Sequence, residues 1–157
     1  MTQSSQIAAP AEREIVIRRV FDAPRAQVFE AWTDPKRIAQ WWGPRGFTTT
    51  IDEMDVRPGG TWRFVMHGPD GVDYPNRVVY DEIVRPERLV HMHGSDKEDE
   101  PGQFQVTVTF AEQSGKTTLT LRMLFQSAAE RDKNVEFGVI EGGNQTLERL
   151  AEHLVND

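Results

Sequence analysis

The feature that most constrains the fold is the alternation of apolar and polar side chains between residues 47 and 126. Turn-forming residues divide this stretch, and we predict six strands, at residues 47–56, 60–67, 73–84, 88–93, 103–112 and 117–126. Because the connections are too short for helical crossovers, these strands should form an antiparallel meander. The β-branched segment at residues 14–21 predicts one more strand, with Ile15 and Ile17 on one face.

Helical spacing flanks this region on both sides. Pro24 and the Asp34-Pro35 pair each start a short helix, because proline is favoured in the first helical turn and Asp34 can cap the second helix. Ser127 and Glu130 match a capping box and open a long C-terminal helix. Its apolar stripe consists of Phe137, Ile140, Gly143, Leu147, Leu150 and Leu154.

Two adjacent glycines, Gly142 and Gly143, lie inside this predicted helix, where each costs about 1 kcal/mol relative to alanine. Two interpretations are open. Bulky side chains of the sheet could press against the helix at this point, or the missing side chains could leave room for a ligand. Both interpretations place this turn of the helix over the sheet.

Composition and charge exclude several classes of function. The chain has no cysteine, which removes disulfides, thiolate catalysis and thiolate metal sites. Its formal net charge of −7 repels phosphate backbones and anionic lipids, so neither nucleic acid nor membrane insertion is expected. We expect a flexible tail at residues 1–13 and a single domain at residues 14–157. The lack of a leader-like or membrane-spanning apolar run predicts a cytoplasmic protein.

Aromatic and methionine side chains share faces of the predicted strands. If those faces line the inside of a curved sheet, one helix need not fill the concavity, and flexible methionines suit an adaptable apolar cavity. A fully packed core is the alternative. We predict a cavity that binds a small apolar molecule and needs no cofactor. Its predicted lining is Trp41, Trp62, Phe64, Met66, Tyr80, Phe104, Phe125, Phe137, Ile140 and Gly143.

Candidates for catalysis are few. His91 and His93 are two residues apart, so a strand would place both on one face, a spacing that metal sites use. No third ligand is evident beyond His67 on another strand, and we predict no metal site. An acid–base pair could be drawn from five side chains whose mutual geometry the sequence does not fix, namely His91, His93, Tyr80, Arg77 and Glu141. Phosphate-binding glycine motifs and a serine nucleophile elbow are absent.

Several motifs, taken in order, make the chain resemble a known family from residue 14 to the C-terminus. They are Val20-Phe21-Asp22-Ala23-Pro24, Ala31-Trp32-Thr33-Asp34-Pro35, Trp41-Trp42-Gly43-Pro44, Pro58-Gly59-Gly60-Thr61-Trp62-Arg63, Asp70-Gly71, Pro86-Glu87-Arg88-Leu89-Val90 and Val106-Thr107-Val108-Thr109-Phe110. Each motif is weak alone. As an ordered set they are similar to the heat-shock-protein ATPase activator homologue-like (AHSA-type) family of the START-like, or SRPBCC, superfamily.

The resemblance implies an α+β helix-grip fold. It comprises a curved antiparallel sheet of about seven strands, two short helices and a long C-terminal helix over a cavity. Relatives in the superfamily bind lipids, hormones or polyketides, and some catalyse cyclisation or dehydration. The resemblance therefore implies a fold and a pocket without naming a reaction. The activator role of the family's namesake does not carry over, because that protein uses an additional N-terminal domain.

Three functions are open at this point. The first is binding of a small apolar ligand. The second is an enzyme of cyclase or dehydratase type in the same cavity, with His91, His93 or Tyr80 as acid or base. The third is a protein-interaction or chaperone-related stress-response module, in which Trp41 and Trp42 form a surface patch. A homodimer is compatible with the family, but no segment demands one.

Overall fold

The structure is a computed structural model that describes residues 10–96 and 103–155. Residues 1–9 of the predicted tail and part of the acidic loop, residues 97–102, therefore lie outside the described residues. The elements, in chain order, are η2 (Pro10–Glu12), β1 (Glu14–Phe21), α1 (Arg25–Thr33), α2 (Pro35–Trp41), β2 (Thr48–Met54), β3 (Thr61–His67), β4 (Asp73–Val84), β5 (Arg88–Ser95), β6 (Phe104–Gln113), β7 (Lys116–Leu124), α3 (Ala128–Glu136) and α4 (Val139–Val155).

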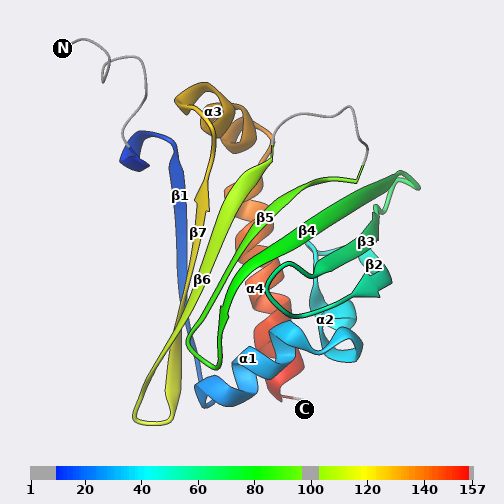
Figure 1. Cartoon of the computed structure of the whole chain (residues 1–157). Helices are drawn as coiled ribbons and strands as arrows, with labels where there is room; N and C mark the ends of the chain where they lie inside the picture. The colour runs from blue at the N-terminus through cyan, green and yellow to red at the C-terminus, as the bar shows by residue number, and fades with distance from the viewer. Residues whose placement is uncertain (1–9, 97–102, 156–157) are drawn as a thin grey trace, which may run out of the picture.

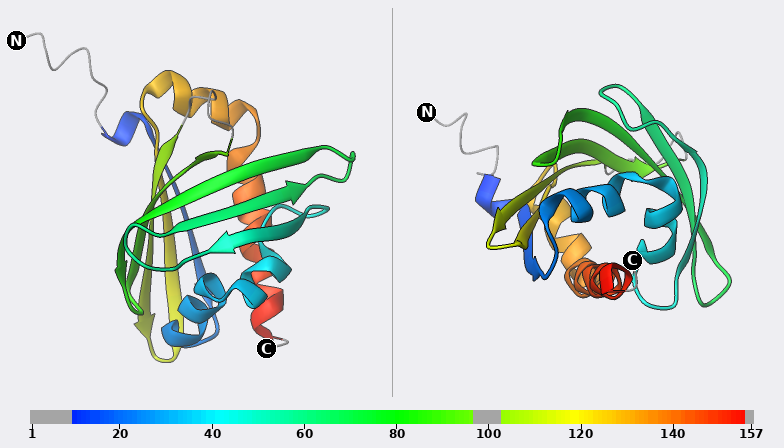
Figure 2. Two further views of the ribbon diagram at one scale, coloured as in Figure 1. Left: turned by 45° about the vertical axis from the view of Figure 1, so that its right-hand side comes forward. Right: turned by 90° about the horizontal axis from the view of Figure 1, so that it is seen from below.

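Within the described residues, seven strands form one antiparallel sheet in the order β1-β7-β6-β5-β4-β3-β2 (Figure 1). The predicted meander is therefore confirmed, and β1 and β4 have the predicted bounds. The first strand of the chain forms one edge of the sheet by pairing with the last, which places Ile15 opposite Met123. The sheet curves around α4, as Figure 2 shows in the view from below.

The two short helices lie at one end of the sheet (Figure 1). α2 begins as predicted, because the Asp34 carboxylate accepts a hydrogen bond of 2.9 Å from the backbone N–H of Lys36. It ends at Trp41, just before Gly43, which has a φ of 103°. That backbone conformation suits glycine, so the chain can turn sharply here towards β2.

The C-terminal helical segment differs from the single helix that the sequence predicts. The Ser127 cap is present, since its hydroxyl accepts from the backbone N–H of Glu130 at 3.1 Å. However, α3 ends near Phe137, and Gly138 takes a φ of 85° before α4 begins. A left-handed glycine is a common helix terminator because it carries no Cβ to clash. Periodicity predicted the apolar stripe but could not show that the helix axis breaks within it.

Gly142 and Gly143 remain helical within α4. A Cβ atom added to Gly143 would lie 2.6 Å from Cδ1 of Ile17 on β1, closer than side chains pack in proteins. The structure therefore supports the first interpretation of this pair at Gly143, where a bulky sheet residue presses against the helix. At Gly142 the added atom would meet Pro44, with Cγ at an ordinary 3.4 Å and Cβ at 4.0 Å.

The hydrophobic core lies between the concave face of the sheet and the helices α1, α2 and α4. Its largest side chains with less than 2% exposure include Phe21, Trp41, Trp62, Phe64, Tyr80 and Phe110. The helices of the described residues are all too short or too polar to span a membrane.

Candidate functional site

A pocket of about 490 Å³ lies between the concave face of the sheet, the loop after α2 and the junction of α3 with α4. We call it the internal pocket. Most of its lining is apolar and includes Trp32, Trp42, Met66, Phe104, Leu121 and Met123. Its polar lining comes from Tyr74, Asn76, His91, His93, Asn134 and Thr146. No acidic or basic side chain other than histidine lines the pocket among the described residues.

The structure brings only part of the predicted ligand-binding set to this pocket. Met66, Phe104, Phe137 and Gly143 line it. Trp41, Trp62, Phe64, Tyr80 and Phe125 instead lie in the packed core, each 1–2% exposed. Alternation placed the strand residues of this group on the inner face of the sheet, but that face extends beyond the pocket. Near α1 and α2 the space is filled by side chains from those helices.

The interpretation of Trp41 and Trp42 as a surface patch is wrong. Trp41 is 1% exposed, and its indole N–H donates to the carbonyl of Ala31 at 3.1 Å. Trp42 is partly buried, with its ring centroid 5.2 Å from that of Trp62 and 5.8 Å from that of Trp32. Both rings therefore belong to an aromatic cluster inside the domain, where edge-to-face contacts are favourable.

His91 and His93 both line the internal pocket, because they are two residues apart on β5 and point to the same face. His91 is 2% exposed and packs edge-on against Tyr80, with ring centroids 5.8 Å apart. Burial, with a further contribution from His93, lowers the pKa of His91 to about 3. Burial alone lowers the pKa of His93 to about 4. Both rings are therefore uncharged at neutral pH.

Asn76 fixes the protonation of the His93 ring. Its side-chain N–H donates to the backbone carbonyl of Tyr74 at 2.8 Å, which turns the amide oxygen towards His93. That oxygen lies 2.9 Å from Nε2 of His93 and can only accept, so Nε2 carries the proton and Nδ1 carries the lone pair. Sequence reasoning missed Asn76, although it shares the inward face of β4 with Val78 and Tyr80.

His67, Arg77 and Glu141, the other polar candidates, do not lie in the pocket with His91 and His93. His67 lies between Thr50 and Asp73, with 2.7 Å separating its ring nitrogens from each partner oxygen, and it does not line the pocket. Arg77 is also absent from the lining, and Glu141 lies on the outer side of α4. Among the described residues, no group of three or more His, Cys, Asp or Glu side chains is placed to hold a metal ion.

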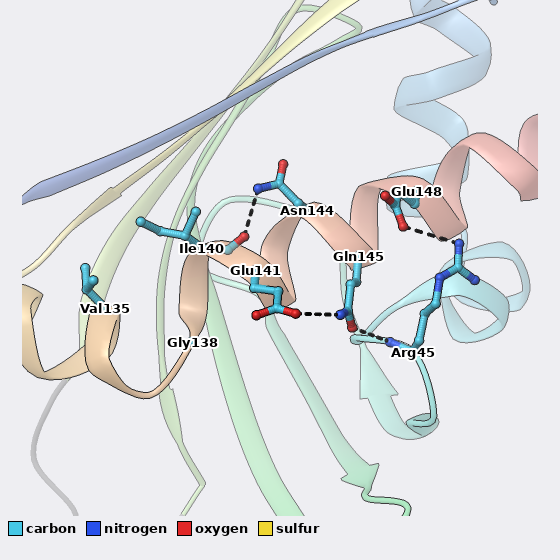
Figure 3. A pocket seen from close by; sticks show the side chains of 8 residues that line it. All are labelled: Arg45, Val135, Gly138, Ile140, Glu141, Asn144, Gln145 and Glu148. Carbon is cyan, nitrogen blue, oxygen red and sulfur yellow. Dashed lines mark hydrogen bonds and ion pairs between the residues drawn. The ribbon is translucent and has the colours of Figure 1, made fainter.

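A second hollow lies on the outer side of α4 and the α3–α4 junction, and Figure 3 shows its lining. Ile140, predicted to face the ligand, lies here and is 40% exposed. The polar side chains of this outer hollow bind one another. Arg45 lies 3.4 Å from the Glu148 carboxylate, and its backbone N–H donates to Gln145 at 3.1 Å. An open surface with paired charges offers a ligand little beyond what water offers, so we assign the candidate site to the internal pocket.

Arg149 holds one wall of the internal pocket in place. Its guanidinium donates to the backbone carbonyls of Trp42 and Gly43 at 3.3 and 2.8 Å, and also to those of Gln40, Pro44 and Phe47. Burial lowers the pKa of Arg149, with Arg45 adding to the effect and Glu152 opposing it. No sequence pattern predicts this role, because the partners are main-chain atoms about 100 residues away.

Comparisons with known proteins agree with the fold. Residues 22–155 match the family model described as Activator of Hsp90 ATPase homolog 1-like protein. Curated proteins give no match. A solved protein of Chromobacterium violaceum is 28% identical with a TM-score of 0.78, covering 90% of this chain and 96% of its own. A solved protein of Mycobacterium smegmatis is 26% identical with a TM-score of 0.82, and the match covers 92% of this chain and 91% of that protein.

A solution structure from Arthrobacter aurescens is 26% identical with a TM-score of 0.87, covering 96% of this chain and 90% of its own. Because each of these likenesses spans at least nine-tenths of both chains, it concerns the whole domain. The predicted α+β helix-grip fold is thereby confirmed.

Proposed function

This chain belongs to the Activator of Hsp90 ATPase homolog 1-like family, and from that premise we propose that it binds a small, largely apolar molecule in the internal pocket. The observation that carries the proposal is the pocket itself. Its volume of about 490 Å³ falls in the range of small-molecule sites, roughly 300–1,000 Å³. Aromatic and methionine side chains supply apolar contacts, and the few uncharged polar groups can orient a ligand.

The protonation of the pocket favours binding over acid–base catalysis. A general base works best when its pKa lies near the working pH, whereas burial lowers the pKa of His91 to about 3 and that of His93 to about 4. Burial also raises the pKa of Tyr80, and Tyr80 does not line the pocket. We therefore place the cyclase-type alternative behind ligand binding.

A matched pair of substitutions on α4 tests the proposal. Thr146 lines the internal pocket and Asn144 lines the outer hollow. Each side chain makes one hydrogen bond back to the helix, Thr146 to the carbonyl of Gly142 at 2.9 Å and Asn144 to that of Ile140 at 3.0 Å. Replacing either by phenylalanine removes the same kind of bond and adds the same ring, so only the side of the helix differs.

We expect Thr146→Phe to weaken pyrene binding at least about tenfold, because the added ring occupies the pocket. Asn144→Phe should leave the affinity unchanged. Pyrene fluorescence titration measures both, and circular dichroism checks that each variant is folded. Wild-type protein that takes up no pyrene, or affinity lost only in Asn144→Phe, would remove the basis for placing a ligand in the internal pocket.

A further inference from the structure

His91 is a buried polar side chain of the internal pocket. It is 2% exposed, lines the internal pocket, and its Nδ1 is fully enclosed. Within residues 10–96 and 103–155, neither of its ring nitrogens has a hydrogen-bond partner. Buried polar groups nearly always have partners, because an unpaired one keeps the full cost of leaving water. A ligand that reaches this ring could supply the missing bond.

The neighbouring polar groups narrow the chemistry of that ligand. His93 already uses its proton on Asn76, so its remaining ring nitrogen can only accept. The indole N–H groups of Trp32 and Trp42, which also line the pocket, are buried without a partner in the described part of the chain and can only donate. Residues that carry acceptors and residues that carry donors thus line the same pocket, and a hydroxyl group can satisfy both kinds.

The charge of the pocket lining restricts the chemistry of the ligand further. The described lining offers neither a lysine nor an arginine to pair with an anion, and burial opposes protonation of either histidine. A carboxylate or phosphate carried into this pocket would therefore lose its hydration without gaining a counter-charge, which is strongly unfavourable. Uncharged groups meet no such penalty.

We infer that the natural ligand is an uncharged molecule with a hydroxyl group, a phenol or an alcohol on an apolar frame, and that His91 holds this hydroxyl. The inference rests on the proposed function, because it concerns the same pocket. It specifies which apolar molecules the pocket selects and which residue selects them.

Three probes on one ring system test the inference: 1-hydroxypyrene, 1-methoxypyrene and 1-pyrenecarboxylate. The wild-type protein at pH 7 should bind the hydroxyl probe at least about tenfold more tightly than the methoxy probe, since only the former donates a hydrogen bond. It should bind the carboxylate most weakly. His91→Phe should bind the hydroxyl and methoxy probes equally, while His91→Asn, which still donates and accepts, should keep part of the preference.

A second readout separates selection by His91 from a structural role. Because His91→Phe replaces an unpaired polar ring by an apolar ring of similar shape, the melting temperature should stay the same or rise. In the wild type, ¹⁵N chemical shifts of the His91 ring should move when 1-hydroxypyrene is added and not when 1-methoxypyrene is added. This measurement needs no variant.

Equal wild-type affinities for the hydroxyl and methoxy probes would overturn the inference while leaving ligand binding intact. The same holds if the carboxylate binds most tightly, or if His91→Phe keeps the hydroxyl preference. Failure of all the pyrene probes, pyrene itself included, to bind would instead overturn the proposed function.

Discussion

The two ends of α4 are held in opposite ways. In its C-terminal half, Leu147 and Leu150 are at most 1% exposed, and Arg149 bonds to carbonyls of the loop after α2. At the other end, Ile140 in the first turn is 40% exposed, and Phe137, which lies just before the helix, is 79% exposed. The helix α3, which adjoins this end in Figure 1, contains no buried residue. The C-terminal half of α4, which we call the fixed end, is packed against the domain, whereas the N-terminal end, which we call the open end, is exposed. Residues of both halves line the internal pocket.

This difference indicates that the two ends of α4 contribute differently to stability. Elements with many buried contacts carry the global stability of a domain, whereas elements with few can open at low cost in free energy. The fixed end supplies a rigid wall through Trp42 and Gly43. The open end presents exposed apolar side chains instead. His91, on β5, adds a buried ring that has no hydrogen-bond partner among the described residues, which lowers stability unless a ligand is bound.

The largest predicted change in the free energy of unfolding is the pH-dependent change that His91 causes. The folded pKa of His91 is about 3, below the usual value of about 6.5 for an unfolded chain. Between these values the unfolded chain binds more protons, so the stability contribution is complete above pH 6.5 and is lost as pH falls. Between pH 6.5 and 4.5 we expect the wild type to lose roughly 2–3 kcal/mol relative to His91→Phe.

Denaturant unfolding at a series of pH values measures this difference. Tyr80 and His93 face the His91 ring, and the described pocket lining has no carboxylate to stabilise a protonated imidazole. Surface carboxylates affect both proteins alike and cancel in the comparison. Parallel stability curves for wild type and variant would show that His91 is not held uncharged.

The next largest change in the free energy of unfolding should come from a substitution at the fixed end of α4. Replacing Arg149 by methionine keeps the aliphatic stem but removes hydrogen bonds to five backbone carbonyls between Gln40 and Phe47. We expect the free energy of unfolding to fall by about 2 kcal/mol, since hydrogen bonds to charged groups are among the stronger ones. Chemical denaturation followed by tryptophan fluorescence measures this free energy of unfolding.

Arg45→Met is the matched control for this change. Arg45 reaches α4 through Glu148 and Glu152, but its side chain is 48% exposed and its partners face water. Exposed pairs of this kind contribute little to stability. Equal stability of the two variants would show that the hydrogen bonds from Arg149 to the backbone carbonyls do not stabilise the fixed end.

The smallest effect should come from Phe137, at the open end of the apolar stripe. Because the side chain is 79% exposed, Phe137→Ala should change the free energy of unfolding by less than about 0.5 kcal/mol. Leu147→Ala, ten residues further along the same stripe, should cost roughly 2–5 kcal/mol because Leu147 is 1% exposed. Thermal unfolding of both proteins measures the contrast. A large loss in Phe137→Ala would mean that this end is packed in solution.

Much of the fold could be predicted from local pattern. Asp34 caps α2 as predicted, and alternation placed Trp62 and Phe64 on the inner face of β3. Ser127 starts a helix at the predicted residue, but that helix is α3 and not the single long helix that was expected. The break at Gly138 could not be predicted, because glycine is also tolerated inside helices, as Gly142 and Gly143 show. Whether a glycine ends a helix depends on where the next segment must pack.

The candidate site was only partly predictable for the same reason. The spacing of His91 and His93 was enough to place both on one face, and Met66 and Phe104 reach the pocket as predicted. Nothing in the pattern distinguishes those residues from Trp62 or Tyr80, which have the same inward orientation but lie where the core is solid. Packing against α1 and α2 makes that distinction.

The amino-acid sequence by itself determined the strands, the starts of α1, α2 and α3, the inward faces and the family, because each depends on residues that are neighbours along the chain. Only the tertiary structure decided where the inward faces leave a pocket and how Arg149 fixes one wall. It also decided why, among the described residues, His93 has a hydrogen-bond partner and His91 has none. Those properties depend on side chains that meet from distant elements, and their distances are set by packing rather than by sequence spacing.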